Sequence, residues 1–140
     1  MVGLCVAVIV SREETVNEEI LSKEEVLLYA AKIVEERGWT RNTLARTEYG
    51  DAVGPNSEHA VTWCAQGAVI RATYELSEGR INAFHHLPQT ILNSMNRSMG
   101  QQVQRTVTGL NDSVFEDSSQ VADLLRDMAE RSKKWKTRSS

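Results

Sequence analysis

Residues 22–38, SKEEVLLYAAKIVEERG, carry the pattern that decides the fold. Ser22 and Glu25 form a capping-box pair, in which the hydroxyl accepts a free backbone N–H and the carboxylate reaches back to the cap. The apolar residues that follow recur at intervals of three and four, so they cover one face of a helix. Gly38 supplies the left-handed conformation that commonly ends a helix. This stretch predicts a helix over residues 23–37. Its apolar face consists of Val26, Leu27, Ala30, Ile33 and Val34.

A second helix is predicted to begin at Asn56 or Ser57 and to carry mostly small side chains on one face. Small side chains let another backbone approach closely, so we expect this helix to lie innermost. Gly67 in its middle costs about 1 kcal/mol relative to Ala, and close packing at that point is the simplest compensation. The predicted apolar face consists of Val61, Cys64, Ala65, Ala68, Val69 and Ala72.

Two more helices are predicted in the second half of the chain. Pro88 suits the first turn of the third helix, where its missing N–H costs nothing, and Gly100 stops that helix. The fourth helix is expected to start near Asp117 or Ser118. Four short apolar stripes need one another for burial, so the sequence predicts a mainly α, compact bundle of about four helices. The apolar stripe of the third helix consists of Ile91, Leu92, Met95 and Met99, and that of the fourth helix consists of Val121, Leu124, Leu125 and Met128.

A minor β element is a further expectation. Residues 2–10, VGLCVAVIV, are apolar but far too few to span a membrane, and a short strand is favoured. Residues 103–108, VQRTVT, alternate apolar and polar, which is a weak strand signal. The two segments could pair in a two-stranded sheet, or the first could cover a partner subunit. Residues 39–56 contain glycine and proline and are predicted to be mostly loop.

The length and composition of the chain are those of one globular domain. We expect residues 1–140 to form a single domain, with an apolar and acidic extension at 1–21 and a basic tail at 131–140. Residues 1–60 carry 6 Lys and Arg against 11 Asp and Glu, a net charge of −5, and residues 61–140 carry 10 against 8, a net charge of +2. The overall net charge of −3 argues against a general affinity for nucleic acid or for an anionic membrane.

Three short motifs occur in a recognisable order: Arg37-Gly38-Trp39, Trp63-Cys64-Ala65-Gln66-Gly67-Ala68 and Leu110-Asn111-Asp112. Their order and spacing resemble an uncharacterised family of small bacterial and phage proteins, known as a domain of unknown function. The resemblance covers residues 23–73 and 108–130. The family has an aromatic residue where this chain has Leu110, so the chain departs from the family pattern at that position. The resemblance implies a shared fold and brings no activity with it.

The same motifs supply the candidate binding residues, which are Trp39, Trp63, Asn111 and Asp112. In one interpretation, Asn111 and Asp112 line a pocket beside the two tryptophans. In the other, which is the commoner use of such a pair, they form an Asx-type turn at the start of the fourth helix. Tryptophans are more often core anchors than ligand platforms, although an indole can serve as both.

Cys64 is the weak catalytic candidate. A nucleophilic thiol needs a lowered pKa, from a nearby base or a helix N-terminus. Cys64 is predicted to lie two turns into its helix on the apolar face, where burial would raise the pKa, so a packed core thiol is favoured. Cys5 and Cys64 make no disulfide framework, and we expect both to be reduced, in a cytoplasmic protein.

No metal or cofactor site is expected. His85 and His86 are adjacent and would point apart on a helix, and His59 and Cys64 are five residues apart, which also separates their directions. No glycine-rich phosphate loop and no nucleophile elbow occurs in the sequence.

The C-terminal tail interleaves an aromatic residue with positive charges. Basic residues neutralise phosphates and an aromatic ring can stack on an unpaired base, so the tail is a candidate nucleic-acid contact. The favoured alternative is a solvated helix end whose charges complement the helix dipole. The candidate residues are Arg131, Lys133, Lys134, Trp135 and Lys136.

Three functions from different classes are consistent with these patterns. The first is a non-catalytic helical binding or regulatory module, of phage or mobile-element origin, with an unknown protein partner. The second is a nucleic-acid-associated accessory protein that uses the basic tail. The third is a small thiol enzyme centred on Cys64. We favour the first, expect no association with a membrane, and consider self-association plausible because of the apolar stripes.

Overall fold

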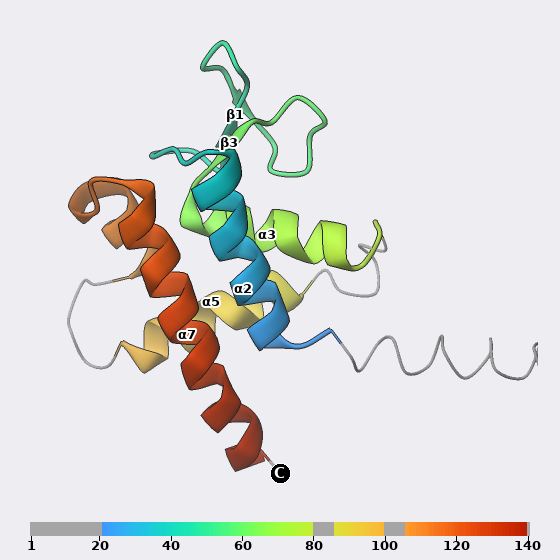
Figure 1. Ribbon diagram of the computed structural model, residues 1–140, viewed down its shortest axis with the longest axis vertical. Coiled ribbons are helices and arrows are strands. Elements are labelled where there is room, and N and C mark those ends of the chain that lie inside the picture. Colours follow the sequence, from blue (N-terminus) through green and yellow to red (C-terminus); the bar gives the residue numbers. More distant parts are fainter. Residues whose placement is uncertain (1–20, 80–85, 100–105, 140) are drawn as a thin grey trace, which may run out of the picture.

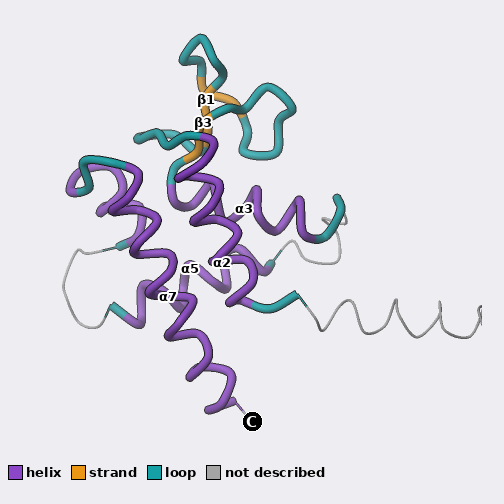
Figure 2. The backbone as a smooth tube through the Cα atoms, viewed as in Figure 1, coloured by secondary structure: helices purple, strands orange, loops and turns teal. Residues whose placement is uncertain are grey.

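The computed structural model describes residues 21–79, 86–99 and 106–139, and this part of the chain is mainly helical, as predicted (Figure 1). The N-terminal apolar run at 2–10 and the residues 103–105 lie outside the described residues. The four longer helices correspond to the four predicted ones (Figure 2). Their bounds are Lys23–Lys32 for α2, Ala65–Leu76 for α3, Leu87–Ser98 for α5 and Ser118–Ser139 for α7. Two short π-helices, η1 at Ile33–Arg37 and η2 at Leu110–Val114, extend α2 and the short helix α6 at Val107–Gly109.

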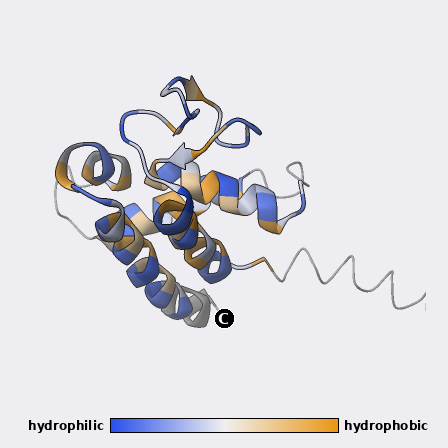
Figure 3. Ribbon diagram, turned by 45° about the horizontal axis from the view of Figure 1, so that its top comes forward, coloured by the Kyte–Doolittle hydropathy of each residue, from blue (hydrophilic) through white to orange (hydrophobic). Residues whose placement is uncertain are grey.

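Helix α2 packs against both α7 and α3, and α5 contacts α3 and α7. The capping box predicted for α2 is confirmed. The Ser22 hydroxyl accepts from the Glu25 N–H, and the Glu25 carboxylate accepts from the Ser22 N–H, both at 3.1 Å. The predicted apolar face is buried, and apolar and polar stripes run along the helices (Figure 3). The core of the bundle therefore lies where α2, α3, α5 and α7 meet.

Helix α3 begins at Ala65, so the prediction that this helix starts at residue 56 or 57 is wrong. The residues before it are extended, because their backbone groups pair with other segments. The Trp63 N–H donates to the Gly38 carbonyl at 3.1 Å, and the Cys64 N–H donates to the Leu44 carbonyl at 3.1 Å. Val61, which the sequence predicts on the apolar face of this helix, is 40% exposed.

The predicted close packing at Gly67 is confirmed. A Cβ at this position would overlap the backbone carbonyl of Leu44. Glycine is needed here because the chain before β1 crosses directly over the first turn of α3.

Residues 39–56 are mostly loop, as predicted, but they also contain two of the three short strands of a small sheet that the sequence did not indicate. Strand β1 is Ala45–Arg46, β2 is Ala52–Val53 and β3 is Thr62–Trp63. The strands are antiparallel in the order β2-β1-β3, with Ala45 opposite both Val53 and Trp63. Trp39 joins Trp63 through an isolated parallel bridge. The sheet and its loops form the upper part of the molecule in Figure 1.

The strand predicted at 103–108 is wrong in its described part. Val107 begins α6, and the Thr106 hydroxyl caps this helix by accepting from the Gly109 N–H at 3.0 Å. The Val107 N–H donates to the Asn96 side-chain oxygen at 2.9 Å, which fixes α6 against the end of α5. Alternating residue type alone could not reveal this cap.

The predicted starts of the other two helices are confirmed. Pro88 lies in the first turn of α5, and Asp117 caps α7 by accepting from the Gln120 N–H at 3.1 Å. Among the described helices, none is long and apolar enough to cross a membrane.

Candidate binding site at Trp39

The three sequence motifs meet at one side chain, that of Asn111. The Trp39 indole Nε1 donates to the Asn111 Oδ1 at 2.7 Å, and the backbone N–H of Ala65 donates to the same oxygen at 2.9 Å. Trp39 directly follows η1 and Gly38, Ala65 is the first residue of α3, and Asn111 lies in η2. One amide oxygen therefore joins segments that are far apart in the sequence.

The amide nitrogen of Asn111 continues this network. It donates to the Thr40 carbonyl at 3.2 Å and to the Asp112 Oδ1 at 2.9 Å. Asp112 Oδ1 also accepts from the backbone N–H of Asn42 at 2.9 Å. Asn111 is only 1% exposed, and its hydrogen bonds satisfy the polar atoms of its buried amide.

The interpretation of Asn111 and Asp112 as an Asx-type turn at the start of the fourth helix is wrong. Both residues lie within η2, and the cap of α7 is Asp117. Their side chains reach across to the Trp39 segment instead of turning the chain locally. This use of the pair depends on tertiary contacts, and no local sequence signal distinguishes it from a turn.

Two π-helical turns flank the site. The Gly38 N–H donates to the Ile33 carbonyl at 3.2 Å, and the Phe115 N–H donates to the Leu110 carbonyl at 2.9 Å, so each bond spans five residues. A π-turn inserts one residue into a helix and redirects the side chains that follow, and such turns are frequent at functional sites. Here the two turns bring Trp39 and Asn111 into hydrogen-bonding distance.

Cys64 closes the N-terminus of α3 as its cap residue. The Sγ atom accepts from the Gly67 N–H at 3.2 Å, and the side chain is 5% exposed. The predicted position two turns into the helix is therefore wrong, whereas the predicted burial is confirmed. Burial raises the pKa of the Cys64 thiol, and this effect outweighs the backbone N–H groups that lower it. A raised pKa is the opposite of the lowered pKa that a nucleophilic thiol needs.

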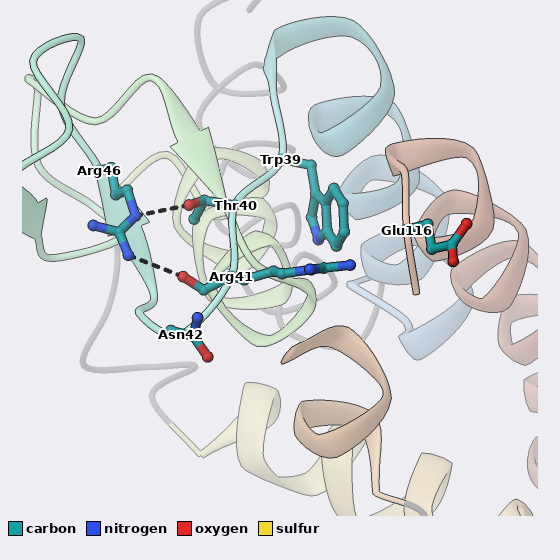
Figure 4. A pocket seen from close by; sticks show the side chains of 6 residues that line it. All are labelled: Trp39, Thr40, Arg41, Asn42, Arg46 and Glu116. Atoms are coloured by element: carbon teal, nitrogen blue, oxygen red, sulfur yellow. Dashed lines mark hydrogen bonds between the residues drawn. The ribbon is translucent and has the colours of Figure 1, made fainter. Parts of the chain in front are cut away.

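A shallow pocket of about 400 Å³ opens beside this network (Figure 4). The Arg41 guanidinium lies 5.2 Å from the centre of the Trp39 ring, a cation–π contact, and its Nη2 donates to the Phe115 carbonyl. These contacts connect the segment after η1 with the segment after η2. The residues that line the pocket are Trp39, Thr40, Arg41, Asn42, Arg46 and Glu116.

Arg46 supports the pocket from β1. Its Nε donates to the Thr40 hydroxyl at 2.8 Å, and its Nη2 donates to the Arg41 carbonyl at 3.1 Å, both drawn in Figure 4. Its Nη1 donates to the Gly50 carbonyl at 2.9 Å. All three acceptors are uncharged. Arg46 therefore holds the segment after Trp39 in place, and no carboxylate among these acceptors neutralises its positive charge.

Of the four predicted binding residues, one lines the pocket. Trp39 forms part of its wall. Asn111 and Asp112 do not line the pocket, but they bind the Thr40 carbonyl and the Asn42 N–H and so fix the backbone of the lining segment. Trp63 is a core residue, 2% exposed, and its Nε1 donates to the Pro55 carbonyl at 2.9 Å. It does not line the pocket.

Sequence reasoning missed the pocket's arginines, Arg41 and Arg46. Neither lies in a motif, and the only available signal was the density of basic and polar residues directly after Trp39. It also missed a second polar cluster, around Glu75. The Arg71–Glu75 spacing of four residues on a helix is a signal that could have indicated part of it.

The Glu75 cluster joins α2, η1 and α3. Arg37 binds both carboxylate oxygens of Glu75 at 2.7 and 2.9 Å, and Arg71 Nε donates to Oε2 at 2.6 Å. The Tyr29 hydroxyl donates to Oε1 at 2.5 Å. These donors, with Arg37 the largest contributor, lower the pKa of Glu75 to about 2, and the bond to Glu75 raises the pKa of Tyr29. Arg37 and Arg71 also lie 5.9 and 5.4 Å from the Trp63 ring centre.

Two of the tail residues proposed for nucleic-acid contact bind within the protein. Arg131 pairs with Asp127 at 3.1 Å and donates to the Ser98 carbonyl at 2.9 Å. Lys133 lies 3.6 Å from Glu24 and 3.4 Å from Glu130. Lys134, Trp135 and Lys136 belong to α7, and their side chains lie outside the described part.

The histidines considered as metal ligands form no metal site in the described part of the chain. Within residues 21–79, 86–99 and 106–133, no three His, Cys, Asp or Glu side chains are grouped so that they could hold a metal ion. His59 is exposed and lies 3.5 Å from the Glu58 carboxylate. His85 lies outside the described residues.

The comparisons with known proteins place the chain in a family of unknown function. A mainly helical fold with a small antiparallel sheet is the class of protein that the geometry defines. Residues 21–131 match the model of the family of unknown function DUF6197, and the chain belongs to this family. The resemblance to an uncharacterised family that the sequence motifs indicated is thereby confirmed. No curated protein and no solved structure matches the chain.

Proposed function

We propose that this protein is a non-catalytic binding module, which receives one group of a protein partner in the pocket at Trp39. The observation that carries this proposal is the fixed position of the pocket wall. Asn111 and Arg46 hold residues 39–41 through hydrogen bonds to Trp39, Thr40 and Arg41. A preorganised wall lowers the cost of ordering on binding, which is the property expected of a recognition site.

A non-catalytic role is supported by the chemistry of the lining. Thr40 is the hydroxyl-bearing residue of the pocket, and its Oγ1 accepts from the Arg46 guanidinium instead of contacting a base. Activation of a hydroxyl requires a neighbouring general base within hydrogen-bond distance. Cys64, the other candidate nucleophile, is buried and caps α3. The lining therefore suits recognition better than covalent catalysis.

A protein partner is supported by exposed apolar side chains in the turns that adjoin pocket residues in the sequence. Val114, in the turn of η2 that precedes the pocket residue Glu116, is 49% exposed. Tyr49, in the turn between β1 and β2, is 82% exposed, and aromatic side chains are enriched in protein interfaces. We place this interaction in the cytoplasm of a bacterium or of a phage-infected cell, where Cys64 stays reduced. Light scattering would show whether the partner is a second copy of this chain.

The test is an NMR titration of the full ¹⁵N-labelled chain with a fragment set that contains acidic, basic and uncharged molecules. We expect shifts of the Trp39 indole N–H and of the backbone signals of residues 40–42. The Trp63 indole N–H is the internal control, because this side chain is buried away from the pocket. If fragments shift other surfaces and leave residues 39–42 unchanged, the proposed site is wrong.

A further inference from the structure

We infer that the pocket at Trp39 binds a carboxylate, held by the Arg41 guanidinium. This inference rests on the proposed function, because it names the chemistry of the group that the same pocket receives. It depends on three observations: the absence of ion pairs at the pocket arginines, the geometry around Arg41, and the position of the nearby acidic residues.

The first observation is that the pocket arginines have no carboxylate partner among the described residues. Arg41 donates to the Phe115 carbonyl, and Arg46 donates to one hydroxyl and two carbonyls. Elsewhere in the described chain, most arginines form ion pairs. Those that do are Arg37, Arg71, Arg126 and Arg131. Two guanidinium groups without an ion pair among the described residues line the pocket at Trp39, and they create a positive potential that favours an anion.

The second observation is the incomplete hydrogen bonding of Arg41. Its Nε is covered by protein and has no acceptor within the described residues. A buried donor without an acceptor is unfavourable, and the cost is larger for a charged group. A ligand in the pocket would supply the acceptors that the protein does not give to this guanidinium. The planar fork of a guanidinium matches the two oxygens of a carboxylate.

The third observation concerns Asp112 and Glu116, the acidic residues near the pocket. Asp112 Oδ1 accepts from the Asn42 N–H and from the Asn111 amide, so the Asp112 side chain is held by uncharged donors. Glu116 is exposed at the rim of the pocket and makes no ion pair with Arg41. Both carboxylates limit the negative charge that the site tolerates. A singly charged, planar carboxylate therefore fits better than a doubly charged phosphate.

The carboxylate could belong to a free organic acid or to an acidic side chain of a protein partner. Both sources present the same two oxygens to Arg41. The proposed function predicts the second source. The experiment below has separate arms for the two.

The experiment is an NMR titration of the full chain at constant ionic strength, with benzoate and its uncharged counterpart benzamide as the first pair of probes. Benzoate should shift the Trp39 indole N–H and the Thr40 amide, and benzamide should bind at least about tenfold more weakly. Inorganic phosphate should bind more weakly than benzoate. A capped tripeptide with a central glutamate, compared with its glutamine counterpart, tests the protein source.

Three variants complete the test. Arg41→Gln should weaken benzoate binding by about tenfold or more, and Glu116→Gln should strengthen it, because a competing negative charge is removed. Arg97→Gln is the matched control, since Arg97 is exposed on α5 and donates to Ser94 away from the pocket. It should leave the affinity unchanged. Glu116 is exposed, so its substitution is expected to leave the fold intact even if Arg41→Gln fails to fold.

The possible outcomes separate this inference from the proposed function. If benzamide binds at residues 39–42 as tightly as benzoate, or phosphate binds more tightly, the carboxylate inference is overturned and the binding pocket stands. If no probe of any charge shifts these residues, both are overturned. Tighter binding of the glutamate peptide than of benzoate supports carboxylate recognition on a protein. The reverse order supports carboxylate recognition and overturns the protein partner.

Discussion

The indole nitrogen of Trp39 donates a hydrogen bond of 2.7 Å to the side-chain oxygen of Asn111, 72 residues further along the chain. The same oxygen accepts from the first N–H of α3. A single buried amide therefore fixes the approach of η1, α3 and η2 to one another. Each of the three sequence motifs of this chain supplies one partner of this contact.

Replacement of Asn111 by alanine should destabilise the protein by about 2 to 4 kcal/mol. The substitution leaves the buried Ala65 N–H and the partly buried Trp39 indole N–H without an acceptor. A buried orphan donor costs about 1 to 3 kcal/mol, and a partly exposed one costs less. Urea denaturation followed by circular dichroism measures the change. Asn93→Ala is the matched control, because Asn93 is exposed on α5 and accepts from Gln89. A loss below about 0.5 kcal/mol for Asn111→Ala, the range of ordinary surface changes, would contradict the role given to this contact.

Replacement of Gly67 by alanine should destabilise the protein by about 1 to 3 kcal/mol or prevent folding, although alanine is the better helix former. The added Cβ would overlap the Leu44 carbonyl, which is backbone and cannot turn aside. Gly54→Ala provides the control, since nothing lies within 4 Å of a Cβ at that position. The thermal midpoints of the two variants check the prediction. An increase in the midpoint of Gly67→Ala would show that helix propensity outweighs the contact.

Much of the helical fold could be predicted because its signals are local. The Ser22–Glu25 capping box and Asp117 each mark a helix start through bonds to residues within one turn, and Pro88 marks one because its missing N–H costs nothing there. The start of α3 could not be predicted in this way. Val61 lies three residues before Cys64, which is a helical spacing, yet the backbone of residues 61–63 pairs with Gly38 and Arg46. Such distant partners leave no periodic trace in the sequence.

The candidate site was predictable in part for the same reason. Trp39, Asn111 and Asp112 were identified through motifs, and the structure brings them together. Arg41 and Arg46 were missed because their importance comes from what surrounds them. An arginine without a carboxylate partner is recognisable only when its neighbours in space are known.

Glu75 should make the stability of the protein depend on acid pH. The pKa of Glu75 is lowered from an ordinary value of 4.5 to about 2, mainly by the hydrogen bonds from Arg37. Because the folded-state pKa lies below that of the unfolded chain, the ionised carboxylate stabilises the fold above pH 4.5. This stabilisation is lost as the pH falls from 4.5 towards 2. One pKa unit corresponds to about 1.4 kcal/mol, so the shift from 4.5 to about 2 corresponds to about 3.5 kcal/mol. Because the Glu75 side chain is 20% exposed, screening by solvent reduces the expected stabilisation to about 2 to 3 kcal/mol.

Denaturation by urea at a series of pH values between 2 and 7 measures this dependence. The Glu75→Gln variant should be less stable than the native chain at pH 7, and its stability should change less over the acid range. Glu36→Gln is the control, because Glu36 is exposed on the neighbouring π-helix. Parallel pH profiles for the native chain and for Glu75→Gln would show that the cluster does not hold the charge of Glu75.

The Cys64 thiol should react slowly with iodoacetamide in the folded protein. Its side chain is 5% exposed, and burial raises its pKa, so the reactive thiolate is scarce and covered. In a Cys5→Ser background, which leaves one thiol, labelling at pH 8 should be at least about 100-fold slower without urea than in 8 M urea, because reaction requires opening of the structure. The rate in the absence of urea should rise in the Asn111→Ala variant, since loss of the Asn111 bonds makes opening at the start of α3 easier. Rapid labelling of the folded chain, with a thiolate pKa below that of free cysteine, would instead favour a thiol enzyme and count against a binding module.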